Sequence, residues 1–166
     1  VVMLTGFVAT GLPVAYNTYR QVVGDTNAQV AMSTTASALR DELGLAVAIG
    51  PVSDGVVLYQ KADGTWVKIV NGSVGLEKHM YSDVPNGFTI ASAKDLGTVG
   101  LISEKAIEGA SGADDLRVQM VADASGNYIT YADGVFTVNE IAVYRGSSTN
   151  PIEHIDAYSV RRALES

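Results

Sequence analysis

The chain has 166 residues, of which 47% are hydrophobic and 7% aromatic, and its formal net charge at pH 7 is -7. This length suffices for one domain with its own core. An acidic chain without clustered Lys and Arg is not expected to bind nucleic acid. The lack of cysteine excludes disulfides, thiolate metal sites and a cysteine nucleophile. His79 and His154 lie far apart in the sequence with no nearby ligand set, so we expect no metal and no cofactor.

Residues 1–15 form a hydrophobic segment, and the first charged residue of the chain is Arg20. Water must be excluded from this segment by lipid or by protein. A secretory signal peptide is disfavoured because the apolar run continues into helix-like sequence. We expect the segment to mediate assembly through its large apolar side chains, which are Val1, Val2, Met3, Leu4, Phe7, Val8, Leu12 and Val14.

The hydrophobic segment contains residues that weaken a helix at Gly11, Leu12 and Pro13. In a helix interior, glycine costs about 1 kcal/mol and proline about 3 kcal/mol relative to alanine. We therefore predict that helical hydrogen bonding fails first at these three residues, where the helix would stretch or kink. A Pro13→Ala substitution would stiffen it.

Residues 16–46 read as one amphipathic helix with two apolar stripes. Two stripes indicate two partners, namely the chain's own sheet and neighbouring copies of the helix. Alternatively, the helix is simply central to a monomeric core. The first stripe comprises Tyr16, Tyr19, Val23, Val30, Thr34, Ala38 and Leu45, and the second, facing neighbours or sheet, comprises Met32, Ala36, Leu39 and Leu43.

Residues 50–166 are predicted to form a β-rich head. Asp63-Gly64 and Asn71-Gly72 are strong turn signals and predict a three-stranded antiparallel meander over 56–61, 65–70 and 73–81. Between 82 and 114 we expect a turn at 85–87, a short strand at 88–91, and a loop with local helix at 97–111. Further strands are predicted at 116–121, 128–131, 135–138 and 141–145, with a closing strand at 154–163. The predicted fold class is α+β, a long N-terminal helix packed on an antiparallel sheet.

The sequence carries no signature of an enzyme. It has no Gly-Xaa-Ser-Xaa-Gly, His-Glu-Xaa-Xaa-His or phosphate-binding loop. The acidic stretch 109–115 lacks the spacing of a calcium loop and is predicted to be a surface turn. A sugar-binding aromatic platform is conceivable, but at strand spacing these residues favour cross-strand packing: Tyr59, Trp66, Tyr128, Tyr131 and Tyr144.

The run from Gly11 to Arg20, Gly-Leu-Pro-Val-Ala-Tyr-Asn-Thr-Tyr-Arg, resembles the end of the hydrophobic half-helix of type IV pilins. Its continuation through 21–30 and 39–43 resembles prepilin-type proteins of Gram-positive anaerobes. The resemblance implies a pilin-like fold and a subunit that is cleaved by a prepilin peptidase, waits in the cytoplasmic membrane and is extracted by an assembly platform. It then packs into an extracellular helical filament, a homopolymer serving adhesion or motility.

Two departures from the family accompany this resemblance. The family carries a glutamate soon after its processing site, whereas the first acidic residue here is Asp25, so the resemblance implies that part of the hydrophobic segment precedes Val1. The cysteine pair of many Gram-negative pilins is also absent. Two alternatives stay open: a minor pilin or pseudopilin of a secretion, DNA-uptake or adhesion system, and a single-pass membrane-anchored binding domain.

Overall fold

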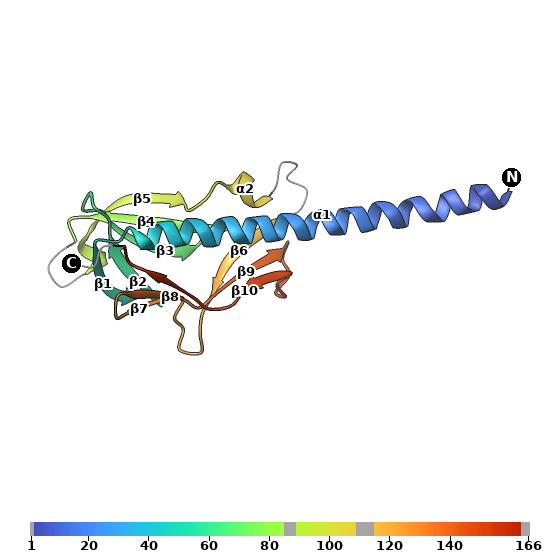
Figure 1. The fold of residues 1–166 in the computed structure, drawn as a ribbon. Helices are drawn as coiled ribbons and strands as arrows, with labels where there is room; N and C mark the ends of the chain where they lie inside the picture. Colours follow the sequence, from blue (N-terminus) through green and yellow to red (C-terminus); the bar gives the residue numbers. More distant parts are fainter. Residues whose placement is uncertain (1, 85–88, 109–114, 164–166) are drawn as a thin grey trace.

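A computed structural model describes residues 2–84, 89–108 and 115–163, with side chains from residue 22 onward. Helix α1 precedes all the described strands, and the shorter helices lie between strands in the chain (Figure 1). The elements are α1 (Val2–Gly44), β1 (Ala48–Ser53), β2 (Val56–Gln60), β3 (Trp66–Asn71), β4 (Leu76–Ser82), the 3-10 helix η1 (Ile90–Ser92), β5 (Lys94–Gly100), α2 (Glu104–Glu108), β6 (Leu116–Val121), β7 (Ile129–Ala132), β8 (Val135–Val138), β9 (Glu140–Arg145), β10 (Glu153–Ile155) and β11 (Tyr158–Arg161).

The predicted α+β fold, a long N-terminal helix packed on an antiparallel sheet, is wrong. From residue 22 onward, the described part of the chain is mostly β, with 44% of residues in 11 strands that form two sheets. The helix with described side chains is 23 residues long and begins at Val22. The physical reason is that the head forms two sheets, each of which buries apolar residues, so it is too large to be a single layer beneath a helix.

The larger sheet has eight strands in the order β11-β8-β7-β2-β3-β4-β5, with β1 also paired to β2. Its pairs are antiparallel except β2 and β7, which meet in parallel at Val56 and Ile129. The smaller sheet has the order β10-β9-β6. The predicted closing strand 154–163 is therefore wrong, because its residues divide between β10 in one sheet and β11 in the other.

Residues 82–114 also differ from the prediction. Ile90–Ser92 form η1 where a strand was expected over 88–91, and residues 85–88, including most of the predicted turn, lie outside the described residues. Strand β5 begins at Lys94 and extends into the predicted loop 97–111, which also contains α2. The strand prediction for 116–121 is confirmed by β6, whose side chains alternate between buried and half-buried.

The two sheets are joined beside the turn between β3 and β4. The Asn71 side-chain amide donates to the Met120 carbonyl at 2.9 Å and accepts from the Met120 N–H at 2.7 Å. The Val118 N–H donates to the Val74 carbonyl at 2.7 Å. These bonds hold β6 against the end of β3, and the main core forms between α1 and the two sheets.

Candidate assembly surface

Helix α1 packs against its own head along one continuous face. Ala28, Ala31, Leu39 and Leu43 have no exposed surface, and the Thr35 hydroxyl, also buried, donates to the Ala31 carbonyl at 2.8 Å. This face contacts α2, β6, β9, β10 and β11. The second predicted stripe lies here: Ala36, Leu39 and Leu43 belong to the core and Met32 packs against it. Its partner is thus the chain's own head.

Polar contacts fix the C-terminal end of α1 on the larger sheet. The Glu42 carboxylate accepts hydrogen bonds from the Tyr59 hydroxyl at 3.0 Å and the Lys78 ammonium at 3.1 Å, and it lies 3.5 Å from the Lys61 ammonium. Burial by itself would raise the pKa of Glu42, but these hydrogen bonds and positive charges together lower it below its usual value. The Ala163 N–H donates to the Gly44 carbonyl at 2.9 Å, which satisfies an orphan carbonyl at the helix end.

The opposite face of α1 is exposed and includes large apolar side chains. Val22 and Val30 are 59% and 55% exposed, and Leu45, which directly follows the last helical residue, is 64% exposed. Val30 and Leu45 belong to the first predicted stripe, together with exposed Thr34 and half-buried Val23 and Ala38. We call residues 22, 26, 30, 33, 34, 37, 38, 41 and 45 the outer helix face.

The middle of the outer helix face is built from small side chains. Ser33, Thr34, Ser37, Ala38 and Asp41 line a shallow hollow of about 440 Å³. A second hollow of about 420 Å³ adjoins it, where the end of α1 meets β11. Small side chains let two helix backbones approach closely, and helices pack at interaxial distances of about 8–10 Å. This face can therefore accept another helix.

The first half of α1 extends past both sheets, so the N-terminal end of this helix lies far from the head (Figure 1). The backbone is helical from Val2, and Gly11, Leu12 and Pro13 lie within this helix. The predicted assembly residues Val2, Met3, Leu4, Phe7, Val8, Leu12 and Val14 share that helical backbone, their side chains lie outside the described ones, and Val1 lies outside altogether. The uncharged part of the sequence thus coincides with the projecting part of the helix.

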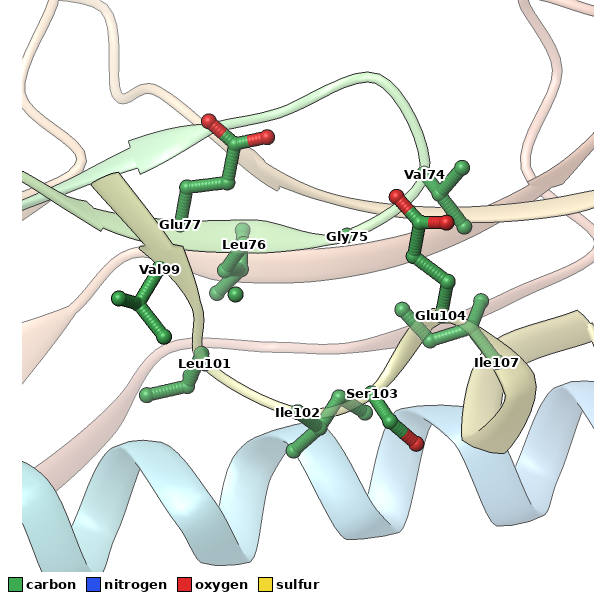
Figure 2. Close-up of a pocket in the computed structure, with 11 residues that line it drawn as sticks. Val74, Gly75, Leu76, Glu77, Val99, Leu101, Ile102, Ser103, Glu104 and Ile107 are labelled. Carbon is green, nitrogen blue, oxygen red and sulfur yellow. The ribbon is translucent and has the colours of Figure 1, made fainter. Parts of the chain in front are cut away.

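A separate cavity of about 400 Å³ lies between the end of β5, the start of β4 and α2. Ile102 and Ser103 point toward α1, whereas Glu104 reaches toward Val74 and Glu77 points away from α1 (Figure 2). The polar side chains of its lining are the carboxylates of Glu77 and Glu104 and the hydroxyl of Ser103, and the other lining residues are aliphatic or glycine. A Cβ at Gly75 would lie 2.2 Å from Ile107 Cδ1, so the end of the Ile107 side chain would have to shift.

The other predicted features have local roles. Tyr59 and Tyr131 pack on Phe136, with ring centroids 6.3 Å and 4.8 Å apart, and Arg117 lies over the Tyr144 ring at 4.6 Å. His79 lies 3.8 Å from Glu77, and His154 lies 3.6 Å from Asp156. Most of the acidic stretch 109–115 lies outside the described residues.

The residues with described side chains contain neither a candidate metal site nor a candidate membrane-spanning helix. Across 2–84, 89–108 and 115–163, no three His, Asp or Glu side chains gather closely enough to hold a metal ion. Among the residues whose side chains the structure describes, which begin at 22, no helix combines the length and hydropathy needed to cross a membrane.

Comparison with protein-family models, curated proteins and solved structures finds no match to this chain. In the sequence, the outer helix face was indicated by the first apolar stripe. Nothing in the sequence pattern indicated that the small polar residues of this face belong to a surface hollow.

Proposed function

We infer that this protein is the structural subunit of a type IV-like pilus and polymerises through α1 into a helical cell-surface filament. The observation that carries the proposal is the coincidence of the uncharged sequence before Arg20 with the projecting half of α1 (Figure 1). The head departs from the expected fold, so the proposal depends on the helix.

The projecting half of α1 is most stable when it is buried among the same helices of other subunits. Each large apolar side chain that leaves water contributes about 1.5–3 kcal/mol, so Val2, Leu4, Phe7 and Val8 together favour association strongly. In a filament the projecting helices pack at the centre and the acidic heads face outward. The outer helix face continues this contact along the head, where its small side chains admit a neighbouring helix.

The resemblance to type IV pilins supplies the route to assembly. Before polymerisation the hydrophobic segment resides in the cytoplasmic membrane, and a prepilin peptidase and an assembly platform act on the subunit. The finished filament is extracellular and serves adhesion or motility. None of these steps requires chemistry by the subunit itself, so we propose no enzymatic activity.

The proposal is tested by removing the hydrophobic segment. The full chain, freed of detergent, should form fibres visible by negative-stain electron microscopy, whereas a variant lacking residues 1–15 should sediment as a soluble monomer. The truncated head should keep its fold because the buried face of α1 begins at Gly24, well after the deleted residues. Fibres formed by the truncated chain would refute assembly through this segment.

A matched pair of variants tests the outer helix face. Ser37→Arg places a long cation in the shallow hollow and should reduce fibre yield at least tenfold. Thr98→Arg introduces the same side chain at an exposed position of β5 and should leave the yield unchanged. Equal yields for the two variants would remove the outer helix face from the interface.

A further inference from the structure

A second cavity lies on the larger sheet, on the side opposite α1. Tyr59 and Lys78 bond to Glu42 of α1, and their partners across the ladder are Val67 and Ile69, so these two strand residues face the helix. Since side chains alternate along a strand, Lys68 and Val70 face the other way. There they line a cavity of about 260 Å³ together with Asp54, Val56, Met120 and Tyr128.

Lys68 is unusual among the residues of this cavity because it is charged and yet only 8% exposed. A buried ammonium requires partners. It donates to the Asp54 carboxylate and, at 3.3 Å, to the Ser53 hydroxyl. Among the described residues these bonds use two of its three donors. The third is available to an acceptor in the cavity.

Asp54 supplies the matching acceptor at the mouth of the cavity. Its side chain is 84% exposed and extends from the turn between β1 and β2, where it adopts a φ of 51°. The Lys68 ammonium, through its hydrogen bond and its charge, holds the pKa of Asp54 below its usual value, so the carboxylate is ionised at neutral pH. The pair is net neutral and offers both donors and acceptors.

The remaining walls are fixed and mainly apolar. Val56, Val70 and Met120 supply aliphatic surface. The Asn71 amide, which also borders the cavity, is occupied on both sides by the Met120 backbone and so holds the wall in place. Tyr128 adds an aromatic ring that lies against Gly55, where a Cβ would be 3.2 Å from its Cδ2 atom.

This combination selects among ligand classes. An anion would meet the Asp54 carboxylate and a cation would meet the Lys68 ammonium, whereas an uncharged polyhydroxylated ligand uses both. Sites for drug-sized ligands usually enclose about 300–1,000 Å³, so this smaller cavity fits a single ring. The apolar face of a sugar ring suits aliphatic and aromatic walls, and its hydroxyls both donate and accept.

We propose that this cavity binds one pyranose ring of an uncharged carbohydrate, with the ring between Tyr128 and Val70 and its hydroxyls bonded to Lys68 and Asp54. The site is independent of the outer helix face, and the carbohydrate proposal does not depend on filament formation. It gives the protein a binding function in either the monomeric or the assembled state.

The test is saturation-transfer NMR on the full chain, which detects weak ligands on large assemblies as well as on monomers. The probes are the methyl glycosides of glucose, galactose, mannose and N-acetylglucosamine, with acetate and tetramethylammonium as anionic and cationic probes. At least one glycoside should receive saturation at millimolar concentration. Transfer to acetate or tetramethylammonium alone, or to no probe, would overturn the proposal.

Two cavity variants and one control locate the binding. Lys68→Met keeps the aliphatic stem but removes the ammonium, and Val70→Phe fills the cavity. Each should weaken glycoside binding at least tenfold, whereas Thr98→Val on the neighbouring β5 should not change it. Circular dichroism checks that the variants are folded. Undiminished glycoside binding by a folded cavity variant would overturn the proposal, because the sugar would then bind elsewhere.

Discussion

Two glycines in tight turns have similar backbones but different surroundings. Gly55 and Gly64 have φ angles of 76° and 86°, in the left-handed region that disfavours a side chain. A Cβ at Gly55 would lie 2.1 Å from the Gly126 carbonyl oxygen, whereas at Gly64 it would meet nothing within 4 Å. Glycine is therefore required at Gly55 both by the left-handed backbone conformation and by the close approach of the Gly126 carbonyl.

Substitution by alanine separates these two requirements. Gly64→Ala should lower the free energy of unfolding by about 1–2 kcal/mol, the cost of a left-handed residue. Gly55→Ala should cost a further 1–3 kcal/mol or so, because the loop carrying Gly126 must move. Urea denaturation of both variants measures the difference. Equal losses would show that the Gly126 carbonyl gives way freely.

The turn residues also show what sequence reasoning captured at this scale. Asp54 and Asp133, each followed by glycine as Asp63 is, have φ angles of 51° and 50°. The Asp63 carboxylate accepts from the Thr65 N–H at 2.9 Å, as expected for an aspartate that stabilises its own turn. What no local pattern could reveal is the approach of Gly126, which is distant in the chain.

At the scale of the element, α1 shows why apolar patterning is an incomplete guide. Its buried face includes Ala28, Ala31 and Thr35, which carry little hydrophobic signal, while Val30 and Leu45 are exposed. Which stripe faces the head depends on the shape of the sheets, and this is a tertiary property. The sequence predicted two apolar faces but could not assign them.

Strands β1 and β5 were missed for different reasons. β1 contains Gly50-Pro51, a pair typical of a turn rather than of a strand, and the ladder accommodates it in a register shift between Ile49 and Val52. Every residue of β5 is exposed, so the alternation that predicts a strand is missing. Pairing with β4 alone specifies this strand.

The Glu42 contacts make the docking of α1 dependent on pH. Because the folded-state pKa of Glu42 is lowered, its contribution to stability is present above its unfolded pKa, near 4.5, and is lost as the pH falls through the folded value. Glu42→Gln should therefore lower stability at pH 7 and reduce the stability lost on acidification from neutral pH to below pH 4.5. Urea midpoints measured across this range test it.

Lys78→Gln provides the companion measurement. It removes the ammonium that bonds Glu42 at 3.1 Å, so it should also reduce the pH dependence, and the double variant should add little. Additive effects of the two substitutions would mean that the residues act separately and that the acid sensitivity of the fold arises elsewhere.

At the scale of the whole molecule, the division into two sheets could not be predicted. Strands β6 and β9 pair over six residues, but nothing in their sequences indicates that they form a sheet apart from β8 and β11. The connection depends on side chains such as Asn71, which reaches 49 residues along the chain to Met120. In the sequence Asn71 precedes Gly72 and read only as a turn residue.

The junction between the sheets should be sensitive to this one amide. Asn71→Ala removes two hydrogen bonds and leaves the Met120 N–H and carbonyl unpaired, so it should cost at least about 2 kcal/mol of unfolding free energy. The matched control is Asn139→Ala, which loses one bond of 2.9 Å to the Val121 carbonyl and should cost about 1 kcal/mol. Thermal and urea unfolding compare the two, and a smaller loss for Asn71→Ala would contradict this role.

The attachment of α1 along its length determines how the protein resists pulling. The head contacts α1 along its length between Ala28 and Gly44. These contacts include the apolar core, the hydrogen bonds to the Glu42 carboxylate and the hydrogen bond from the Ala163 N–H. A pulling force on the projecting end of α1 acts along the helix axis. It therefore loads these contacts in shear, and they must break together. Separating the strands one at a time would need far less force than pulling α1 out of the head along its axis.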